Sequence, residues 1–252
     1  MTDNKTTHNA HDIPNHQRPT VIILHGLYMH KWAMKPLAKR LQKQGFDVQR
    51  FGYYSLLHLL PTHSQRLDAW LSARFSKDTP LYLVGHSLGG LVIRDFLHRY
   101  PAWQVARCVT LGTPHNGSLS ADSVMKLAPS FIGRSYQAGL DGTAPPLKNG
   151  VALGSIAGSH SAGLGKVILP KAHLTPNLAN IANDLYEPFD GQNDGTVFVS
   201  ETRLANAKDH IVLPVSHTGM IFDANVAEQV AYFLIHEQFY RPFDNTDVKK
   251  TS

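Results

Sequence analysis

The chain has 252 residues, of which 42% are hydrophobic and 17% are charged, with 24 basic and 19 acidic side chains. This balance excludes a disordered chain, which combines high charge with little apolar content. The single cysteine, Cys108, excludes an intrachain disulfide framework and a cysteine-based zinc site. The length suits one α/β domain with one sizeable core.

The ends of the chain are polar. Residues 1–19 are rich in histidine and lack the basic and then apolar pattern of a secretory signal. No apolar run is long enough to span a membrane, and a lone cysteine suits a reducing compartment. We therefore expect a disordered polar tail over 1–19, a single domain over 20–240, a polar C-terminal tail over 241–252, and a cytoplasmic protein.

Basic side chains gather in residues 31–50, which hold six of them and the single acidic residue Asp47. Lys35, Lys39 and Lys43 are four residues apart and would form one stripe on a helix. The ordinary interpretation is a solvated helix face. The alternative is weak peripheral contact with a membrane through anionic headgroups. No nucleic-acid-binding motif is recognisable, so nucleic acid is not an expected partner.

Strands and helices alternate along the chain. The predicted elements, in order, are a strand at 20–24, a helix at 35–44, a strand at 46–51 near the sheet edge, a helix at 64–75, a strand at 81–84, a helix at 88–99, strands at 105–111, 151–157 and 211–215, and a helix at 225–239. This alternation predicts an α/β fold with a mostly parallel central sheet and helices on both faces.

Two irregular stretches, 114–150 and 159–194, interrupt the pattern. Stretches this long in a compact domain are commonly functional, and surface decoration is the alternative. Both are expected to lie over the carboxyl ends of the strands, where open α/β sheets bind ligands. We interpret 114–150 as a small lid or cap insertion.

The motif with chemical meaning is Gly85-His86-Ser87-Leu88-Gly89, which follows an apolar strand and opens a helix. This setting is typical of a nucleophile elbow, a sharp turn that exposes a serine hydroxyl. The turn requires glycine two positions before and two after the serine, because larger side chains would collide. The backbone N–H of Leu88, at the start of the helix, favours developing negative charge.

A serine nucleophile needs a base, and the base needs an orienting acid, which follow in the order serine, acid, histidine in this kind of fold. His217 directly follows the last predicted strand and is the expected base. His210, at the other end of that strand, is expected to be structural or solvated. Asp194, in an Asn-Asp-Gly turn, is the best candidate for the acid, with Asp184 and Asp190 as rivals.

The second oxyanion donor should come from the loop after the first strand. Gly26 permits a sharp turn there, and the N–H of Leu27 can then point at the substrate carbonyl oxygen. His25 is expected to fix this loop by hydrogen bonding rather than to act as a second base.

Five ordered segments together resemble the α/β-hydrolase superfamily on its lipase and esterase side. They are residues 21–27, 83–90, 111–118, 193–197 and 216–217. The Gly-Thr-Pro-His-x-Gly stretch beginning at Gly112 is similar to one in bacterial triacylglycerol lipases and glycosylphosphatidylinositol deacylases. The resemblance implies ester hydrolysis through an acyl-enzyme on Ser87, and it favours Asp194 over its rivals.

The sequence also departs from that family. Gly219 stands where many secreted bacterial lipases carry a calcium-binding aspartate, so neither a metal nor a cofactor is expected. A small intracellular esterase or lysophospholipase-like enzyme, acting on a small-molecule or lipid ester without an obligate protein partner, fits best. The alternatives are a thioesterase or acyltransferase on the same triad, and a non-catalytic binding protein on a hydrolase scaffold.

Overall fold

The structure is a computed structural model, which describes residues 19–122, 133–137, 139–148, 150–161 and 191–242. The two rival acids, Asp184 and Asp190, lie outside these ranges, as do most of both predicted tails. Within the described ranges, no helix combines the length and the apolar character needed to cross a bilayer.

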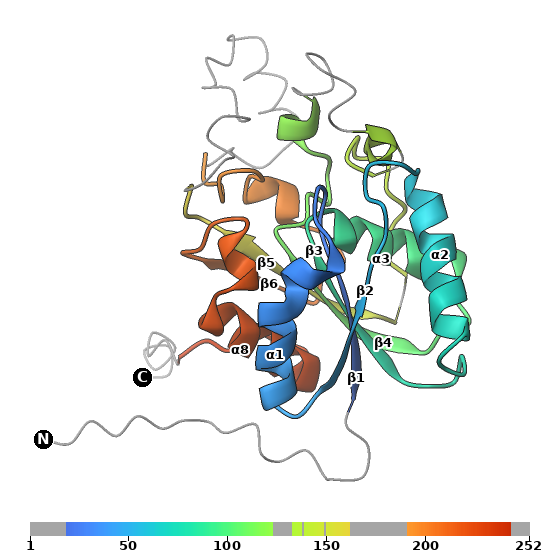
Figure 1. Ribbon diagram of the computed structural model, residues 1–252. Coiled ribbons are helices and arrows are strands. Elements are labelled where there is room, and N and C mark those ends of the chain that lie inside the picture. The colour runs from blue at the N-terminus through green and yellow to red at the C-terminus, as the bar shows by residue number, and fades with distance from the viewer. Residues whose placement is uncertain (1–18, 123–132, 138, 149, 162–190, 243–252) are drawn as a thin grey trace, which may run out of the picture.

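A six-stranded sheet with the order β2-β1-β3-β4-β5-β6 forms the centre of the molecule (Figure 1). All neighbouring strands run parallel, which confirms the predicted parallel sheet. Short apolar and β-branched runs make the inner strands, as expected for strands buried on both faces. The strands are β1 (Thr20–Leu24), β2 (Asp47–Phe51), β3 (Leu81–His86), β4 (Val105–Leu111), β5 (Ala152–Gly158) and β6 (Asp209–Leu213).

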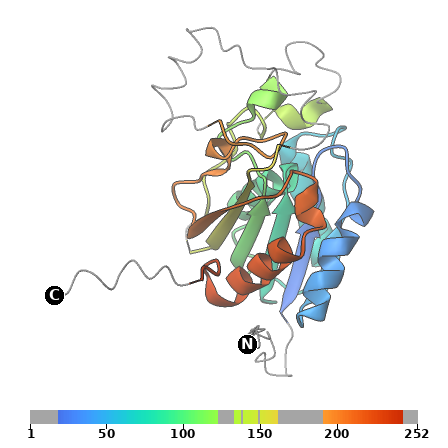
Figure 2. The same ribbon diagram turned by 90° about the vertical axis from the view of Figure 1, so that its left-hand side faces the viewer.

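Helices cover both faces of the sheet, as predicted (Figure 2). On one face, α1 (Lys35–Lys43) and α8 (Ala224–His236) pack over Val21 and Ile23 of β1. On the other face, α2 (Leu60–Ser72) and α3 (Leu88–Arg99) pack over Ile22 and Leu24. Successive strand residues point to opposite faces, so a single apolar strand contributes to both cores.

Several predicted boundaries are wrong, each for a local reason. The last strand was expected at 211–215 but spans Asp209–Leu213, because Pro214 has no N–H to donate to the sheet. Helix α2 begins four residues earlier than expected, with Pro61 in its first turn, where proline is favoured. The last helix ends at His236 because Glu237 takes a left-handed conformation, with φ 59°.

A short 3₁₀ helix, η1 (Lys31–Met34), precedes α1 and was not predicted. The ring of His30 begins it by accepting a hydrogen bond from the backbone N–H of Trp32, at 3.4 Å. Three further 3₁₀ helices, η2 (Gly133–Tyr136), η3 (Ser200–Thr202) and η4 (Gly219–Ile221), lie in the connections beyond the carboxyl ends of the strands (Figure 1).

The buried guanidinium of Arg94, on α3, holds the described parts of 114–150 against the domain. It donates hydrogen bonds to the carbonyl oxygens of His115 at 2.7 Å, Ala144 at 3.1 Å and Pro145 at 2.8 Å. Burial lowers the pKa of Arg94 to about 10. These contacts fix where the segment starts and where it returns to the sheet. Its interpretation as a lid or cap stays a prediction.

Candidate active site

Ser87 lies between β3 and α3, in a backbone conformation that side chains rarely adopt, with φ 53° and ψ −122°. A side chain on Gly85 would place its Cβ 2.5 Å from the backbone nitrogen of Gly90. A Cβ on Gly89 would lie 2.8 Å from the carbonyl oxygen of Leu24. Both contacts are with backbone that cannot move aside, so the turn is open only to glycine at these positions.

The sheet and the next loop hold this strained turn. The backbone N–H of Ser87 donates to the carbonyl oxygen of Leu111, the last residue of β4, at 2.8 Å. The hydroxyl of Thr113 donates to the carbonyl oxygen of Ser87 at 2.9 Å. Because the surrounding contacts determine the conformation so fully, the strain at Ser87 can persist, which is typical of functional sites.

The loop after β1 lies directly against the serine. A Cβ on Gly26 would lie 3.0 Å from the Cβ of Ser87. Within the described part of the chain, neither the N–H of Leu27 nor that of Leu88 donates a hydrogen bond. Two such donors, one next to Ser87 in sequence and one on the loop that lies against it, are what an oxyanion hole would require.

His25 fixes that loop through both ring nitrogens. Nδ1 donates to the carbonyl oxygen of Gly26 at 2.9 Å, and Nε2 accepts from the backbone N–H of Tyr53 at 3.3 Å. The rings of His25 and Tyr53 stack, with 4.3 Å between centroids. The Tyr53 hydroxyl also donates to the His25 carbonyl oxygen at 2.6 Å. Burial lowers the pKa of His25. With both nitrogens engaged, this imidazole is a structural support rather than a base.

Asp194 and His217 come together from loops 23 residues apart in sequence. Oδ2 of Asp194 accepts a hydrogen bond from Nδ1 of His217 at 2.7 Å, and the aspartate is only 1% exposed. The other carboxylate oxygen, Oδ1, accepts from the backbone N–H groups of Thr196 and Val197. The backbone N–H of His217 also donates to the carbonyl oxygen of Asp194 at 2.9 Å. With its proton on Nδ1, His217 has Nε2 available to accept another.

His86 connects this pair to the serine. Its Nε2 donates to the carbonyl oxygen of His217 at 2.9 Å, and the two rings lie 4.7 Å apart between centroids. Burial lowers the pKa of His86 to about 3, so the ring is neutral near pH 7. The residue next to Ser87 thus holds the backbone of the candidate base.

Two glycines that the sequence analysis assigned no role in the site pack against the Asp194–His217 pair. A Cβ on Gly112, where φ is +56°, would lie 2.9 Å from both Oδ2 of Asp194 and Nδ1 of His217. A Cβ on Gly158, at the end of β5, would lie 2.7 Å from the Cβ of Asp194. Gly112 opens the Gly-Thr-Pro-His stretch, so that motif lies around the site.

Further residues of this surrounding were also missed. Buried His115 contacts the Thr110 hydroxyl at 3.0 Å, and burial lowers its pKa well below the usual value. Buried Glu201 accepts from the backbone N–H groups of Leu119 at 2.6 Å and Phe198 at 2.8 Å. Glu201 therefore joins the segment after β4 to the loop that carries Asp194. No motif in a single sequence marks the contact between Glu201 and Leu119, which are 82 residues apart.

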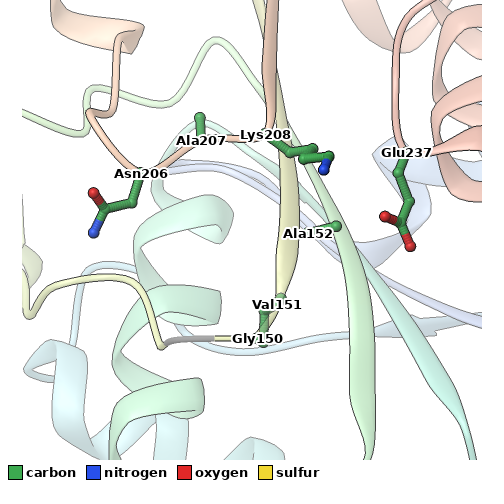
Figure 3. Close-up of a pocket in the computed structure, with 7 residues that line it drawn as sticks. All are labelled: Gly150, Val151, Ala152, Asn206, Ala207, Lys208 and Glu237. Carbon is green, nitrogen blue, oxygen red and sulfur yellow. The ribbon is translucent and has the colours of Figure 1, made fainter.

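The remaining candidate histidine, His210, bonds through Nε2 to the hydroxyl of Thr202 at 2.9 Å, which gives it a structural contact. A surface hollow of about 410 Å³ lies near the start of β5 and β6, lined by Gly150–Ala152, Asn206–Lys208 and Glu237 (Figure 3). None of the candidate catalytic residues lines it.

Comparison with known proteins finds a family model that matches part of the chain. Residues 20–139, which include β1, the loop after it and the turn at Ser87, match the model of the palmitoyl protein thioesterase family. Among curated proteins, none matches the sequence significantly.

Solved structures share the fold over most of the chain. The mature Bacillus licheniformis lipase BlEst2 superposes with a TM-score of 0.67 and 22% identity, over 90% of this chain and 94% of the lipase. Phospholipase PlaB from Legionella pneumophila gives a TM-score of 0.64 and 13% identity, over 88% of this chain and 59% of that one. The metagenomic carboxyl esterase MGS0156 gives a TM-score of 0.54 and 14% identity, over 79% of this chain and 64% of that one. The shared sheet and order of elements show that the chain has the α/β-hydrolase fold.

Proposed function

We propose that the protein hydrolyses carboxylic esters through an acyl-enzyme on Ser87, with His217 as the base and Asp194 as the orienting acid. The observation that carries this proposal is the 2.7 Å hydrogen bond between the buried Asp194 carboxylate and Nδ1 of His217. That bond fixes the tautomer in which Nε2 can accept a proton. Ser87 supplies the strained nucleophile, next to the residue that bonds the His217 backbone.

In the first half-reaction, Nε2 of His217 removes the hydroxyl proton of Ser87 while Oγ bonds to the ester carbonyl carbon. The carbonyl oxygen becomes an oxyanion, which the N–H groups of Leu27 and Leu88 stabilise. Loss of one such donor typically costs about 2.7–4 kcal/mol of transition-state stabilisation. The C–O bond to the alcohol then breaks, and His217 returns its proton to the leaving oxygen.

In the second half-reaction, His217 removes a proton from water, and the resulting hydroxide oxygen bonds to the acyl carbon. The bond to Ser87 Oγ breaks, the serine regains its proton from His217, and the carboxylic acid leaves. The substrate is a small-molecule or lipid ester. The described parts of 114–150 contact the loop that carries Asp194 through the Ser120 hydroxyl, which donates to the carbonyl oxygen of Thr196, and would line part of the acyl pocket.

Thioester hydrolysis is the second candidate. The match of residues 20–139 to the palmitoyl protein thioesterase family favours it. The chemistry differs only in the leaving group, which is a thiol in place of an alcohol, so the same serine, base and oxyanion donors suffice. A comparison at one acyl length, p-nitrophenyl octanoate against octanoyl-coenzyme A, decides which substrate class the site prefers.

Replacement of the nucleophile tests both candidates. We expect Ser87→Ala to lower kcat by about 10⁵-fold or more on whichever substrate the wild type turns over. Ser76→Ala, which changes an exposed serine in the connection between α2 and β3, is the matched control and should keep full activity. Thermal denaturation should show that both variants fold like the wild type.

A fluorophosphonate probe separates the remaining outcomes. Labelling of the wild type but not of Ser87→Ala shows an activated serine, whatever the substrate. Labelling without ester or thioester turnover points to acyl transfer, which added alcohol acceptors would reveal. Absence of both labelling and turnover would leave the non-catalytic binding protein as the remaining interpretation and contradict the proposal.

A further inference from the structure

Two aromatic side chains are exposed on the segments that follow the Leu27 and His217 loops. Trp32, in η1, is 58% exposed, and Phe222, just after η4, is 54% exposed. They flank a groove of about 420 Å³. We call this surface the Trp32–Phe222 patch, and the residues that line its groove are Trp32, Ala33, Lys35, Pro36, Lys39 and Phe222.

The patch is held in a fixed shape. The guanidinium of Arg50, on the edge strand β2, lies 4.6 Å from the centre of the Trp32 ring. The ammonium group of Lys31 lies 5.9 Å from the same ring. On the other side of the groove, the guanidinium of Arg40 donates to the carbonyl oxygen of Phe222 at 3.1 Å. Cations therefore surround both aromatic residues.

Both charged side chains that line the groove are basic. Exposed Lys35 and Lys39 line it directly, and the first turn of α1 carries no acidic residue. The nearest acidic residue after Phe222 is Asp223, whose carboxylate accepts from the backbone N–H of Val226 and caps α8. A solvated helix face explains the lysines, but it does not explain two large exposed aromatic side chains between them.

The terminal segments of the chain do not complement this surface. Residues 1–18 and residues 243–252 each hold two acidic and two basic side chains, so neither segment carries a net negative charge. The patch calls for an occupant that is both anionic and partly apolar. A bilayer surface with anionic headgroups has that character, because tryptophan and phenylalanine enter the headgroup boundary while lysines remain at the charged layer.

The two aromatic residues of the patch follow the two loops of the candidate site closely in sequence. Trp32 follows Leu27, the candidate oxyanion donor, by five residues, and Phe222 follows His217 by five residues. In Figure 1, α1 and the turn after η4 lie side by side, as the Arg40–Phe222 hydrogen bond requires. A bilayer bound here would therefore lie next to the edge of the site.

We propose that the Trp32–Phe222 patch docks the protein on membranes that contain anionic lipids, and thereby holds the candidate active site at the lipid surface. The docking step involves no chemistry, and it can be measured independently of the proposed hydrolysis.

Co-sedimentation with sucrose-loaded vesicles tests the proposal, in the Ser87→Ala background so that no lipid is consumed. Binding should be strong on phosphatidylcholine vesicles with 30% phosphatidylglycerol and weak on pure phosphatidylcholine, and it should fall with added salt. The double variant Lys35→Glu/Lys39→Glu should lower the partition coefficient by at least about 30-fold, the effect of two lysine contacts.

A charge-matched control removes the effect of net charge. Lys77→Glu/Lys208→Glu changes the same number of charges just before β3 and β6, at the opposite end of the sheet, and should bind like the parent. Free inorganic phosphate should not compete with vesicles, which separates a bilayer from a simple anion site.

Tryptophan fluorescence gives a second readout. Trp32 is more exposed than Trp103, which is 2% exposed, and than the half-buried Trp70. Anionic vesicles should shift the emission to shorter wavelength, and Trp32→Phe should abolish that shift while it retains most of the binding. Three results would overturn the proposal. They are no binding to anionic vesicles, equal binding by the two double variants, and displacement of the protein from vesicles by RNA at the same salt concentration.

Discussion

The two halves of the candidate site are built from different kinds of contact. In the serine half, residues 25–28 and 85–90, backbone packs on backbone between elements that are close in the sheet, and glycine provides the space. In the acid–base half, residues 112–116, 191–201 and 214–221, side-chain oxygens and imidazole nitrogens bind backbone groups. Some of these groups are close in sequence, as between Asp194 and Val197, and others are distant, as between Glu201 and Leu119 and between His86 and His217.

This difference predicts different responses to mutation. A backbone contact of 2.5–2.8 Å leaves no space for even one methyl group, so the serine half should tolerate almost no change at its glycines. The acid–base half distributes its hydrogen bonds over several residues, so changes there should give graded losses, set by how directly each residue touches His217.

The largest graded loss should come from Asp194→Asn, about 10⁴-fold in kcat, with the fold retained. An amide that keeps its oxygen toward the Thr196 and Val197 N–H groups presents an NH₂ to His217, and it therefore favours the wrong imidazole tautomer. Steady-state hydrolysis of the best substrate measures the loss.

Asp78→Asn, at an exposed position, is the matched control for this change. If Asp194→Asn kept activity within tenfold while Asp184→Asn or Asp190→Asn abolished it, the acid would be one of the rivals and the assignment would be wrong.

Gly112→Ala should give the next largest loss, about 10²-fold in kcat, because its methyl group would lie 2.9 Å from both Asp194 Oδ2 and His217 Nδ1. Gly150→Ala is a matched control. Gly150 also has a positive φ, +82°, but nothing lies within 4 Å of its Cβ position. Both variants should lose similar stability from backbone strain, and only Gly112→Ala should lose activity. Equal kcat values in the two variants would remove Gly112 from the site.

The difference between the two halves also explains which parts of the site could be predicted from the sequence. The strand, the two glycines and the start of the helix around Ser87 are adjacent in sequence, so the elbow could be predicted together with the parallel sheet. His217 and Asp194 were selected by their order along the chain, which does not fix their geometry. The Gly112 motif was noticed, but its packing against the acid and base depends on how β4, β5 and β6 align.

The errors in the predicted bounds of the last strand and of α2 had local causes, each at a proline. Pro214 ended the last strand two residues before its apolar pattern did, and Pro61 started a helix before its periodic pattern did. The link through Glu201 could not be predicted, because it joins two connections through single hydrogen bonds to backbone N–H groups, which any residue type except proline can supply.

A smaller loss should follow His86→Phe. Phenylalanine keeps a ring against His217 but removes the donor to its carbonyl oxygen, so we expect kcat to fall about tenfold with KM unchanged. The pKa of His86, which burial lowers to about 3, makes the ring neutral between pH 5 and 9. The shape of the pH profile of kcat should therefore be the same in variant and wild type.

His63→Phe provides the comparison for His86→Phe. His63 is also buried, with Nδ1 unpartnered among the described residues, but it bonds to Ser135 instead of His217. This variant should lose stability without the loss in kcat. A changed pH profile in His86→Phe would mean that His86 itself titrates during the reaction.

The smallest effect on activity should come from Glu201→Gln, within about threefold at pH 7, because Glu201 contacts backbone N–H groups and neither member of the Asp194–His217 pair. Its effect on stability should depend on pH. Burial raises the pKa of Glu201 from 4.5 to about 8. A raised pKa means that the folded protein holds a proton that the unfolded chain releases. The contribution of Glu201 to folding stability is therefore fully present below pH 4.5 and is lost as pH rises to about 8.

The contribution of buried neutral histidines to folding stability changes with pH in the opposite direction. The lowered pKa values of His86 and His210 contribute stability that is lost as pH falls below 6.5. The informative quantity is therefore the difference in Tm between wild type and Glu201→Gln, measured from pH 5 to pH 8. That difference should shift steadily in favour of the variant as pH rises, whereas exposed Glu228→Gln should show no trend. A flat difference for Glu201→Gln would mean that its two backbone donors keep the carboxylate ionised, and that the link between the two segments is an anionic one.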